Sequence, residues 1–255
     1  MPDRLAKPLI EREDWADGSI VLHNRTPLPD PLPDILDRWN HGVETTPEAI
    51  FVSERRGDTI HTANYAESDR LSDSCACWLR DAGARIQDRV AVIAGAGIAH
   101  AVIKLAALKA NLVHVPLSPM LLDTPYGRER LAGLLATARP RLTLSILDKP
   151  PQDLRTHCGD WHNLNAVAVA AADHRDFTTE PAELHDPAAI YFTSGSTGDP
   201  KGVSITRGMI ASNQSAYAAH WPFLSQKPPV LIDWLPWHHV FGGLDNFYKM
   251  IWIFI

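Results

Sequence analysis

Cysteine, long apolar runs and blocks of basic residues are scarce or missing in this sequence. Three cysteines in 255 residues, two of them at Cys75 and Cys77 in an apparent helix, cannot build a paired disulfide framework. A reducing, cytoplasmic compartment is therefore expected. The charged N-terminal residues lack the apolar segment of a secretory signal. The apolar end at residues 250–255 is far shorter than the about 20 residues of a membrane span, so no stable membrane insertion is expected.

An excess of positive charge is also missing. Lysine and arginine total 24 against 30 aspartates and glutamates, which gives a formal net charge of −6. The basic residues are scattered along the chain, so no nucleic-acid partner is expected. A hydrophobic content of 45% is enough to bury a core in one or two domains. Nothing in the sequence indicates an oligomeric state.

Proline dominates the N-terminal part of the chain and alternates with other residues from Pro27 to Pro33. Proline fixes φ and cannot donate to a strand ladder. The pattern therefore predicts an extended arm over residues 1–33, laid on the surface of a folded domain that spans residues 34–255.

Helical and strand-like spacing alternate after the arm. A helix is predicted from Asp34, a strand–turn–strand unit around residues 49–62, and an amphipathic helix from Asn64 to Gly83. A strand, a helix and a second strand of suitable length for a βαβ unit follow at 89–94, 98–109 and 112–117. Such a unit requires parallel strands. The sequence thus predicts an α/β fold of layered β-sheets with flanking helices.

The segment from 148 to 187 has the weakest pattern. An alanine-rich stretch at 165–171 is predicted to form a short strand. His157, Cys158 and His162 lie close together in sequence, but a zinc site needs four ligands at workable spacing. These three residues are therefore interpreted as surface-loop residues.

The most informative stretch is YFTSGSTGDPKGV at residues 191–203. It combines hydroxyl side chains with three glycines and ends on Pro200 and Lys201. Small residues let a backbone wrap closely around a ligand, hydroxyls and amides donate to anionic oxygens, and a lysine supplies countercharge. This composition predicts a polyphosphate clamp. A solvated glycine–serine linker is the alternative, but a linker needs neither an apolar lead-in nor a fixed lysine.

Two better-known serine- and glycine-containing motifs do not fit this stretch. A Walker A loop needs glycine before its lysine and Ser or Thr after it, where this chain has Pro200 and Gly202. A nucleophile elbow needs glycine where Ser194 stands. Strand-like segments at 186–192 and 203–205 flank the loop, so its grip should come from loop amides and hydroxyls more than from a helix dipole.

A second glycine-containing turn, Gly95-Ala96-Gly97, suggests a dinucleotide-binding fingerprint. That fingerprint needs a third glycine where His100 stands. A tight turn of the βαβ unit is the favoured interpretation, and a nicotinamide-dependent oxidoreductase is the alternative.

Four motifs together resemble the adenylate-forming superfamily of acyl-CoA synthetases, luciferases and peptide-synthetase adenylation domains. In chain order they are ANYAESDRLS (63–72), LAALKANLVHVPLSP (105–119), TSGSTGDPKG (193–202) and LPWHHVFGG (235–243). The last motif and the segment GSIVLHNRTPLPDPLP look most like feruloyl-CoA synthetases. The resemblance implies the N-terminal part of a large adenylation domain. Such an acid–thiol ligase activates a carboxylic acid, here favoured to be aromatic, with ATP and Mg²⁺ and then joins it to coenzyme A.

The resemblance also implies site residues. The residues carried over as contacts of the β- and γ-phosphates of ATP are Thr193, Ser194, Gly195, Ser196, Thr197, Gly198 and Lys201. His239 matches a histidine at the acyl-substrate pocket, with Trp237 and Phe241 as its walls, and the adjacent His238 is favoured less. A core histidine among aromatic residues is the alternative for His239.

The chain departs from the family pattern after Phe241. The resemblance implies a later acidic motif, a ribose-binding aspartate, a hinge and a small C-terminal domain with a catalytic lysine, and none of these is found. The sequence therefore predicts a truncated member that catalyses little adenylation alone and is poorly soluble, because strand edges and apolar surface stay uncovered. The alternative is a catalytically inactive remnant or a phosphate-binding module.

Overall fold

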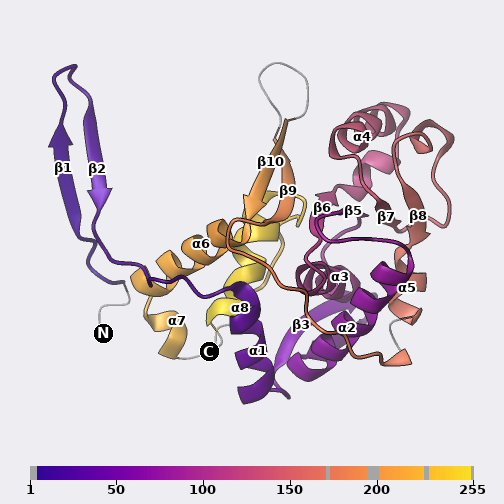
Figure 1. Cartoon of the computed structure of the whole chain (residues 1–255), viewed down its shortest axis with the longest axis horizontal. Coiled ribbons are helices and arrows are strands. Elements are labelled where there is room, and N and C mark those ends of the chain that lie inside the picture. The colour runs from indigo at the N-terminus through magenta and orange to yellow at the C-terminus, as the bar shows by residue number, and fades with distance from the viewer. Residues whose placement is uncertain (1–4, 171–172, 194–200, 227–229, 254–255) are drawn as a thin grey trace.

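The computed structural model describes residues 5–170, 173–193, 201–226 and 230–253 (Figure 1). At its centre is a six-stranded sheet in the order β10-β9-β6-β5-β7-β8. The strands are β5 Arg89–Ile93, β6 Val113–Leu117, β7 Leu142–Ser145, β8 Asp160–Asn163, β9 Pro187–Thr193 and β10 Lys201–Thr206. Strands β5 to β9 pair in parallel, whereas β10 is antiparallel to β9. The predicted α/β fold, with its parallel βαβ unit, is confirmed.

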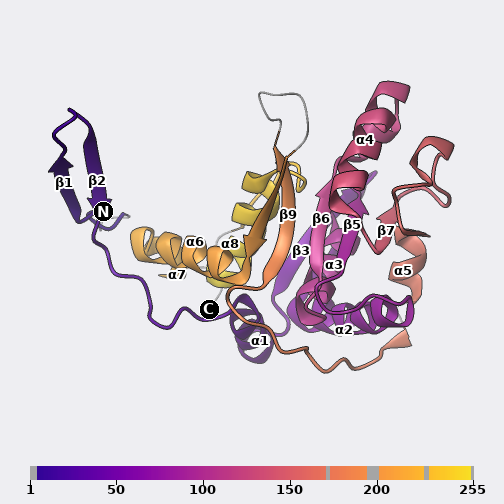
Figure 2. The same cartoon turned by 45° about the horizontal axis from the view of Figure 1, so that its top comes forward.

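Helices cover both faces of this sheet (Figure 2). Helices α2 (Tyr65–Asp81) and α3 (Ile98–Lys109) pack on one face, and α4 (Pro125–Ala138) packs on the other. Successive residues of β5 point to opposite faces, so that Val92 packs with α2 and α3 while Ile93 packs with α4. A parallel sheet buried on both faces accounts for the uninterrupted apolar run of this strand.

Three helices begin at capping side chains, two of which stand where the sequence predicts a helix to begin. The capping residues are Asp34 for α1 (Ile35–Thr45), Asn64 for α2 and Thr206 for α6 (Arg207–His220). Each side-chain oxygen accepts a backbone N–H of the first helical turn at 2.7 to 3.2 Å. These bonds satisfy donors that a helix leaves free at its N-terminus, which is why such short local signals are readable.

A second core lies against the β9 side of the sheet. Helices α1, α6 and α8 (Phe247–Ile253) share this core with β9. Strands β3 (Ile50–Arg56) and β4 (Thr59–Asn64) form the predicted hairpin beside it. The remaining short elements of this body are η1 Pro119–Leu122, η2 Gln152–Leu154, α7 Phe223–Gln226 and the π-helix η4 Phe241–Asn246.

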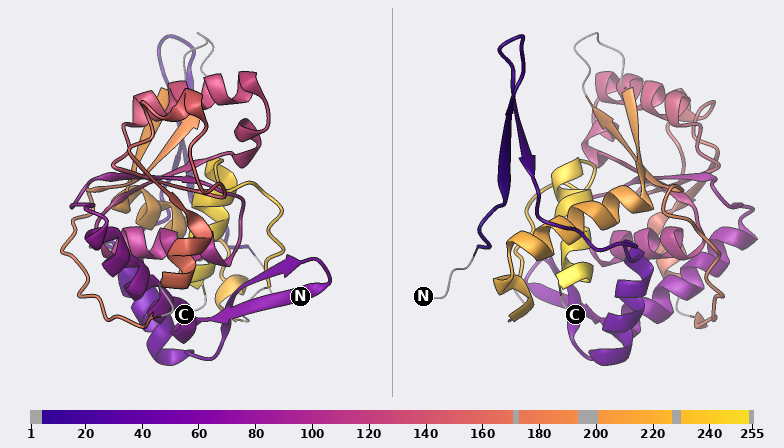
Figure 3. Two further views of the ribbon diagram at one scale, coloured as in Figure 1. Left: turned by 90° about the vertical axis from the view of Figure 1, so that its right-hand side faces the viewer. Right: turned by 60° about the vertical axis from the view of Figure 1, so that its left-hand side comes forward.

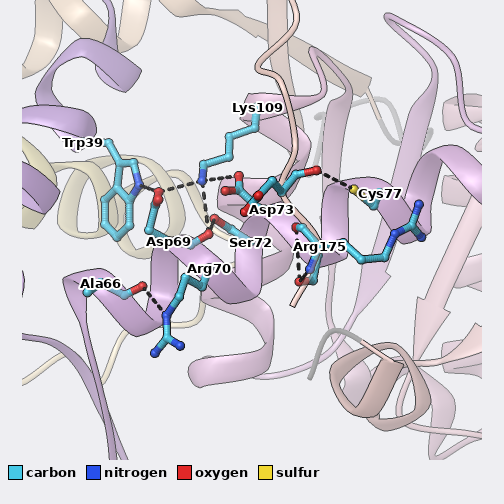
Figure 4. A network of polar contacts seen from close by, with 11 residues as sticks. Trp39, Ala66, Asp69, Arg70, Ser72, Asp73, Cys77, Lys109 and Arg175 are labelled. Carbon is cyan, nitrogen blue, oxygen red and sulfur yellow. Dashed lines mark hydrogen bonds and ion pairs between the residues drawn. The ribbon is translucent and has the colours of Figure 1, made fainter. Parts of the chain in front are cut away.

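A buried lysine joins the first three helices (Figure 4). Lys109 Nζ lies 2.6 Å from a carboxylate oxygen of Asp69 and 2.6 Å from one of Asp73, both on α2. Trp39 of α1 donates its indole N–H to the same Asp69 carboxylate at 2.6 Å. The charge of this lysine is therefore balanced inside the protein, and α1, α2 and α3 are held together by polar contacts as well as by apolar packing.

The N-terminal segment contains an element that the sequence does not predict. Strands β1 (Ile10–Asp14) and β2 (Ile20–Asn24) form an antiparallel hairpin that projects from the rest of the molecule (Figure 3). Gly18, at φ +87°, closes its turn. Asn24 contacts the body through the His220 ring at 2.6 Å. The proline pattern that suggests an extended arm thus applies only to the residues after β2.

Two predictions for the segment from 148 to 187 are wrong. The alanine-rich stretch forms a helix, α5 (Leu164–Ala170), because the Asn163 side chain accepts the N–H groups of Asn165 and Ala166 and Val167 is buried against α2 and α3. Cys158 is not a surface residue: it is only 2% exposed and packs in the core under α4.

The described residues contain no helix long and apolar enough to cross a membrane.

Candidate functional site

The glycine-rich stretch connects β9 to β10, as the sequence predicts. Thr193 is the last residue of β9 and Lys201 the first of β10, and the two are direct partners in the antiparallel ladder. Both side chains are exposed. The other predicted phosphate contacts lie outside the described residues: Ser194, Gly195, Ser196, Thr197 and Gly198. The ladder holds the two ends of the predicted clamp in a fixed register.

A cavity of about 530 Å³ lies beside this hairpin. It is formed where the carboxyl ends of β6 and β9 meet α4 and the residues before η4. Its lining consists of Pro116, Leu117, Ser118, Leu121, Arg130, Leu134, Phe192, Thr193, His238, His239 and Val240. The carboxyl ends of strands are the usual position of ligands in open α/β sheets.

The polar side chains of this cavity favour an anion. No carboxylate is among its described lining residues, although the chain as a whole is acidic. Burial, together with a smaller effect of the neighbouring His239, lowers the pKa of His238 to about 4, so His238 is neutral at pH 7. Arg130 is the one permanent cation in the described lining, and its guanidinium makes no hydrogen bond or ion pair with the described residues. No side chain in the described part of the chain competes with a ligand for this guanidinium.

Backbone contacts hold the turn that carries the two histidines. The His239 amide donates to the carbonyl of Pro236 at 3.1 Å, and the Gly243 amide donates to the carbonyl of His239 at 2.8 Å. The second bond leads into the π-helix η4. Helical segments of this type often occur at functional sites, because the wider turn repositions nearby groups.

The structure separates residues that the sequence places in one acyl pocket. His239 lines the cavity together with Thr193 and His238. Trp237 is 7% exposed, packs edge-on against Phe247, and lines a second cavity of about 500 Å³ on the β3 side. Phe241 is 59% exposed and is in the described lining of neither cavity.

Arg130 was missed by reasoning from the sequence. It lies more than 60 residues before the glycine-rich stretch and belongs to no motif that was singled out. The available signal was its place on α4, which follows β6 after the short helix η1, since residues after a parallel strand reach the ligand edge of the sheet.

The Gly95–Gly97 turn is closed to a dinucleotide phosphate. Glu54 of β3 accepts the N–H of Ile98, the first residue of α3, at 2.7 Å. A Cβ at Gly97 would collide with this same carboxylate. The helix N-terminus, where a pyrophosphate would bind, already holds an internal carboxylate, which supports the tight-turn interpretation.

The described residues contain no group of three or more His, Cys, Asp or Glu side chains that could hold a metal ion. His162 instead packs edge-on against Trp78, with ring centroids 4.9 Å apart.

The sequence profile of the AMP-binding enzyme family matches residues 39–252. The chain belongs to this family. Residues 39–252 include β9, β10 and all of the cavity lining, so the family assignment covers the candidate site.

Known AMP-binding enzymes resemble the chain over most of its length. The probable non-canonical nonribosomal peptide synthetase CymA of Salinispora arenicola is 28% identical over 86% of this chain, which spans 3% of CymA. A fatty acyl-adenylate ligase from L. pneumophila, solved with acyl adenylate and pyrophosphate, superposes with a TM-score of 0.71 at 20% identity. Apo MatB from Rhodopseudomonas palustris gives 0.73 at 24% identity. These superpositions include 90% and 86% of this chain, but only 40% and 43% of the two solved structures.

Proposed function

We propose that this chain binds the triphosphate of ATP between the β9–β10 hairpin and the adjoining cavity, as part of a ligase that activates a carboxylic acid. The observation that carries the proposal is the pairing of Thr193 with Lys201 at the edge of a cavity that contains Arg130 and no described carboxylate. Phosphoryl and adenylyl transfer depend mainly on positioning and on charge stabilisation, and this site offers both.

In the proposed reaction a carboxylate oxygen of the acid attacks the α-phosphorus of ATP. The new bond joins this oxygen to phosphorus, the bond from the α-phosphorus to the bridging oxygen breaks, and pyrophosphate leaves with that oxygen. Lys201, Arg130 and the hydroxyl of Thr193 would stabilise the charge that builds up on the leaving pyrophosphate. His239, at the same cavity, would contact the acid.

The acid and its acceptor form a finer part of the proposal. The motif resemblance supports an aromatic, feruloyl-like acid that passes to coenzyme A, and the apolar wall of Leu117, Leu134 and Phe192 suits a ring or an acyl chain. Mg²⁺ would enter as the ATP complex, since the described residues supply no cluster for it. The low cysteine content supports a cytoplasmic setting.

The second candidate function is a phosphate-binding module without catalysis. It is favoured by the composition of the site, because Thr193, Lys201 and Arg130 could hold phosphate oxygens without any step of catalysis. The chain spans about 40% of the length of the solved structures it resembles. In both candidates residues 34–255 act as the N-terminal part of an adenylation domain, and residues 1–33 lie outside its core.

Binding of Mg·ATP by the 255-residue chain, measured by calorimetry, tests the common step. Lys201→Met should weaken binding about 10-fold, the loss of one charge-assisted hydrogen bond, and the exposed Lys149→Met should leave it unchanged. Equal affinities for the wild type and both variants would refute the proposal.

Pyrophosphate exchange into ATP then separates the two candidates. Exchange that depends on an added acid, compared between ferulate and a fatty acid of similar length, would establish adenylation and indicate the acid class. Binding of Mg·ATP without exchange would leave the phosphate-binding module.

A further inference from the structure

Helix α3 carries a second buried lysine, whose surroundings differ from those of Lys109. Lys104 is 0% exposed, and none of the described ion pairs involves it. Its Nζ donates to the carbonyl of Gly243 and lies 4.1 Å and 4.3 Å from the ring centroids of Phe247 and Tyr248. Burial lowers its pKa well below the ordinary lysine value. A buried amine without a direct carboxylate partner is costly, so its position calls for an explanation beyond packing.

The partner of Lys104 belongs to the histidine-bearing turn. Gly243 donates its N–H to the carbonyl of His239 and accepts a hydrogen bond from Lys104 at its own carbonyl. There is no room to replace Gly243, because a Cβ would collide with the carbonyl of Trp237 and lie 2.6 Å from the Tyr191 hydroxyl. Two hydrogen bonds therefore connect the Lys104 amine to the backbone of His239. The first is made by the carbonyl of Gly243 and the second by its N–H.

Hydrogen bonds to Asp233 hold the same turn at its other end. Asp233 accepts hydrogen bonds from the indole N–H of Trp237 at 2.8 Å and from the Asn246 amide at 3.0 Å. Its negative charge also favours the charged form of Lys104. The turn from Asp233 to Asn246 is thus fixed at Asp233 and at Gly243, with the two histidines between these points.

We infer that Lys104 is a positioning residue that sets the place of His239 at the cavity by holding the Gly243 carbonyl. The inference concerns the geometry of the turn, and its consequence for catalysis rests on the proposed function. Lys104 is too deeply buried to touch a ligand itself, so it acts through the backbone of the turn.

Amide hydrogen exchange tests the inference locally. In Lys104→Met, which keeps most of the length of the side chain and removes the donor, protection of the Gly243 amide should fall about 10-fold relative to the core amide of Val92, because only the turn opens more easily. Lys104→Arg should restore most of this protection. The matched control is Asp73→Asn on α2, which weakens the ion pair of Lys109, the other buried lysine of α3. This variant should leave the ratio of Gly243 protection to Val92 protection unchanged. Equal ratios in Lys104→Met and Asp73→Asn would overturn the inference.

Two further measurements test the role of Lys104 independently of amide exchange. If Lys104→Met does not fold, an NMR correlation across the hydrogen bond from Lys104 Nζ to the Gly243 carbonyl carbon of the wild-type chain replaces it, and absence of that correlation overturns the inference. Where the wild type exchanges pyrophosphate, Lys104→Met should lower kcat and leave the KM for ATP unchanged, and wild-type values of both would overturn it. A wild-type chain that binds no ATP would refute the proposed function, while the exchange ratio would still decide the role of Lys104.

Discussion

Helix α3 carries two buried lysines, Lys104 and Lys109, whose surroundings differ. Lys109 contacts two carboxylates and shares one of them with Trp39, so its charge is balanced within the fold (Figure 4). Lys104 lies beside His100 and His114, two buried histidines whose rings are 3.0 Å apart at Nε2, and no described ion pair balances it. Balanced buried charge is typical of structural networks, whereas unbalanced buried titratable groups cluster near functional sites. The difference predicts that mutations at the Lys109 end change stability, that mutations of Lys104 change the catalytic rate, and that mutations of the cavity lining change binding.

The largest expected effect is at the Lys109 end. Lys109→Met leaves the carboxylates of Asp69 and Asp73 facing each other without their cation, so it should lower the free energy of unfolding by about 4 kcal/mol. Urea denaturation measures the change. If the variant also lost affinity for Mg·ATP while still folded, the division between the two ends of α3 would be broken.

Low pH should lower the stability of the fold through the two buried histidines near Lys104, His100 and His114. Burial lowers the pKa of His100 to about 4 and lowers that of His114 as well. As the pH falls below about 6.5, the unfolded chain therefore takes up protons before the folded chain does, and stability is lost progressively down to about pH 4. Between pH 7 and pH 5, His100 alone should account for about 2 kcal/mol.

Urea denaturation at the two pH values measures this loss, with His100→Asn as the variant in which it should shrink. His61→Gln, at an exposed position on β4, should keep the wild-type pH dependence. If the free energy of unfolding of the wild type were the same at both pH values, the buried histidines would have the same pKa in the folded and the unfolded chain.

Arg130 should affect binding rather than folding. Arg130→Gln removes the permanent cation from the described cavity lining and should weaken pyrophosphate binding about 10-fold with little change in melting temperature. Arg128 on the same helix is the matched control, because it pairs with Asp153 at 3.0 Å and caps the carbonyl of Leu122. Arg128→Gln should lower stability and leave pyrophosphate affinity unchanged. The reverse pattern would assign the cavity to another ligand.

The smallest expected effect sharpens the comparison at the Lys109 end. Trp39→Phe keeps most of the ring packing and removes the hydrogen bond to Asp69, so it should cost about 1 kcal/mol of unfolding free energy. In a double-mutant cycle with Asp69→Asn the two losses should not add, because both variants break one contact. Additive losses would mean that the indole contributes by packing alone.

The elements of this fold were predictable where short-range chemistry decides them. Asp34 and Asn64 cap their helices through bonds within three residues, and the apolar strand at 89–93 could only be buried. The helix α5 was not predictable, because an alanine–valine alternation fits a strand and only the Asn163 cap and the packing of Val167 decide against it.

Candidate site residues could be named where a motif carries them. Thr193, Lys201 and His239 stand within two short stretches, and the fold brings Thr193 and His239 to one cavity, while their functional roles stay predictions. Trp237 lines a different cavity from His239, since closeness in sequence does not fix the direction of a side chain. Arg130 reaches the cavity only through the packing of α4 on the sheet, which no local pattern encodes.

The register of β9 with β10 has a consequence for the entropy of binding. Thr193 and Lys201 face each other across the ladder, so the ends of the intervening residues 194–200 meet when the protein folds and not when a ligand arrives. Joining the ends of a chain segment costs entropy that grows only slowly with length, by about 0.6 kcal/mol for each doubling. A polyphosphate that binds here is spared that loop-closure cost. Inserting glycines between Thr193 and Lys201 should therefore weaken binding far less than unpairing the two strands.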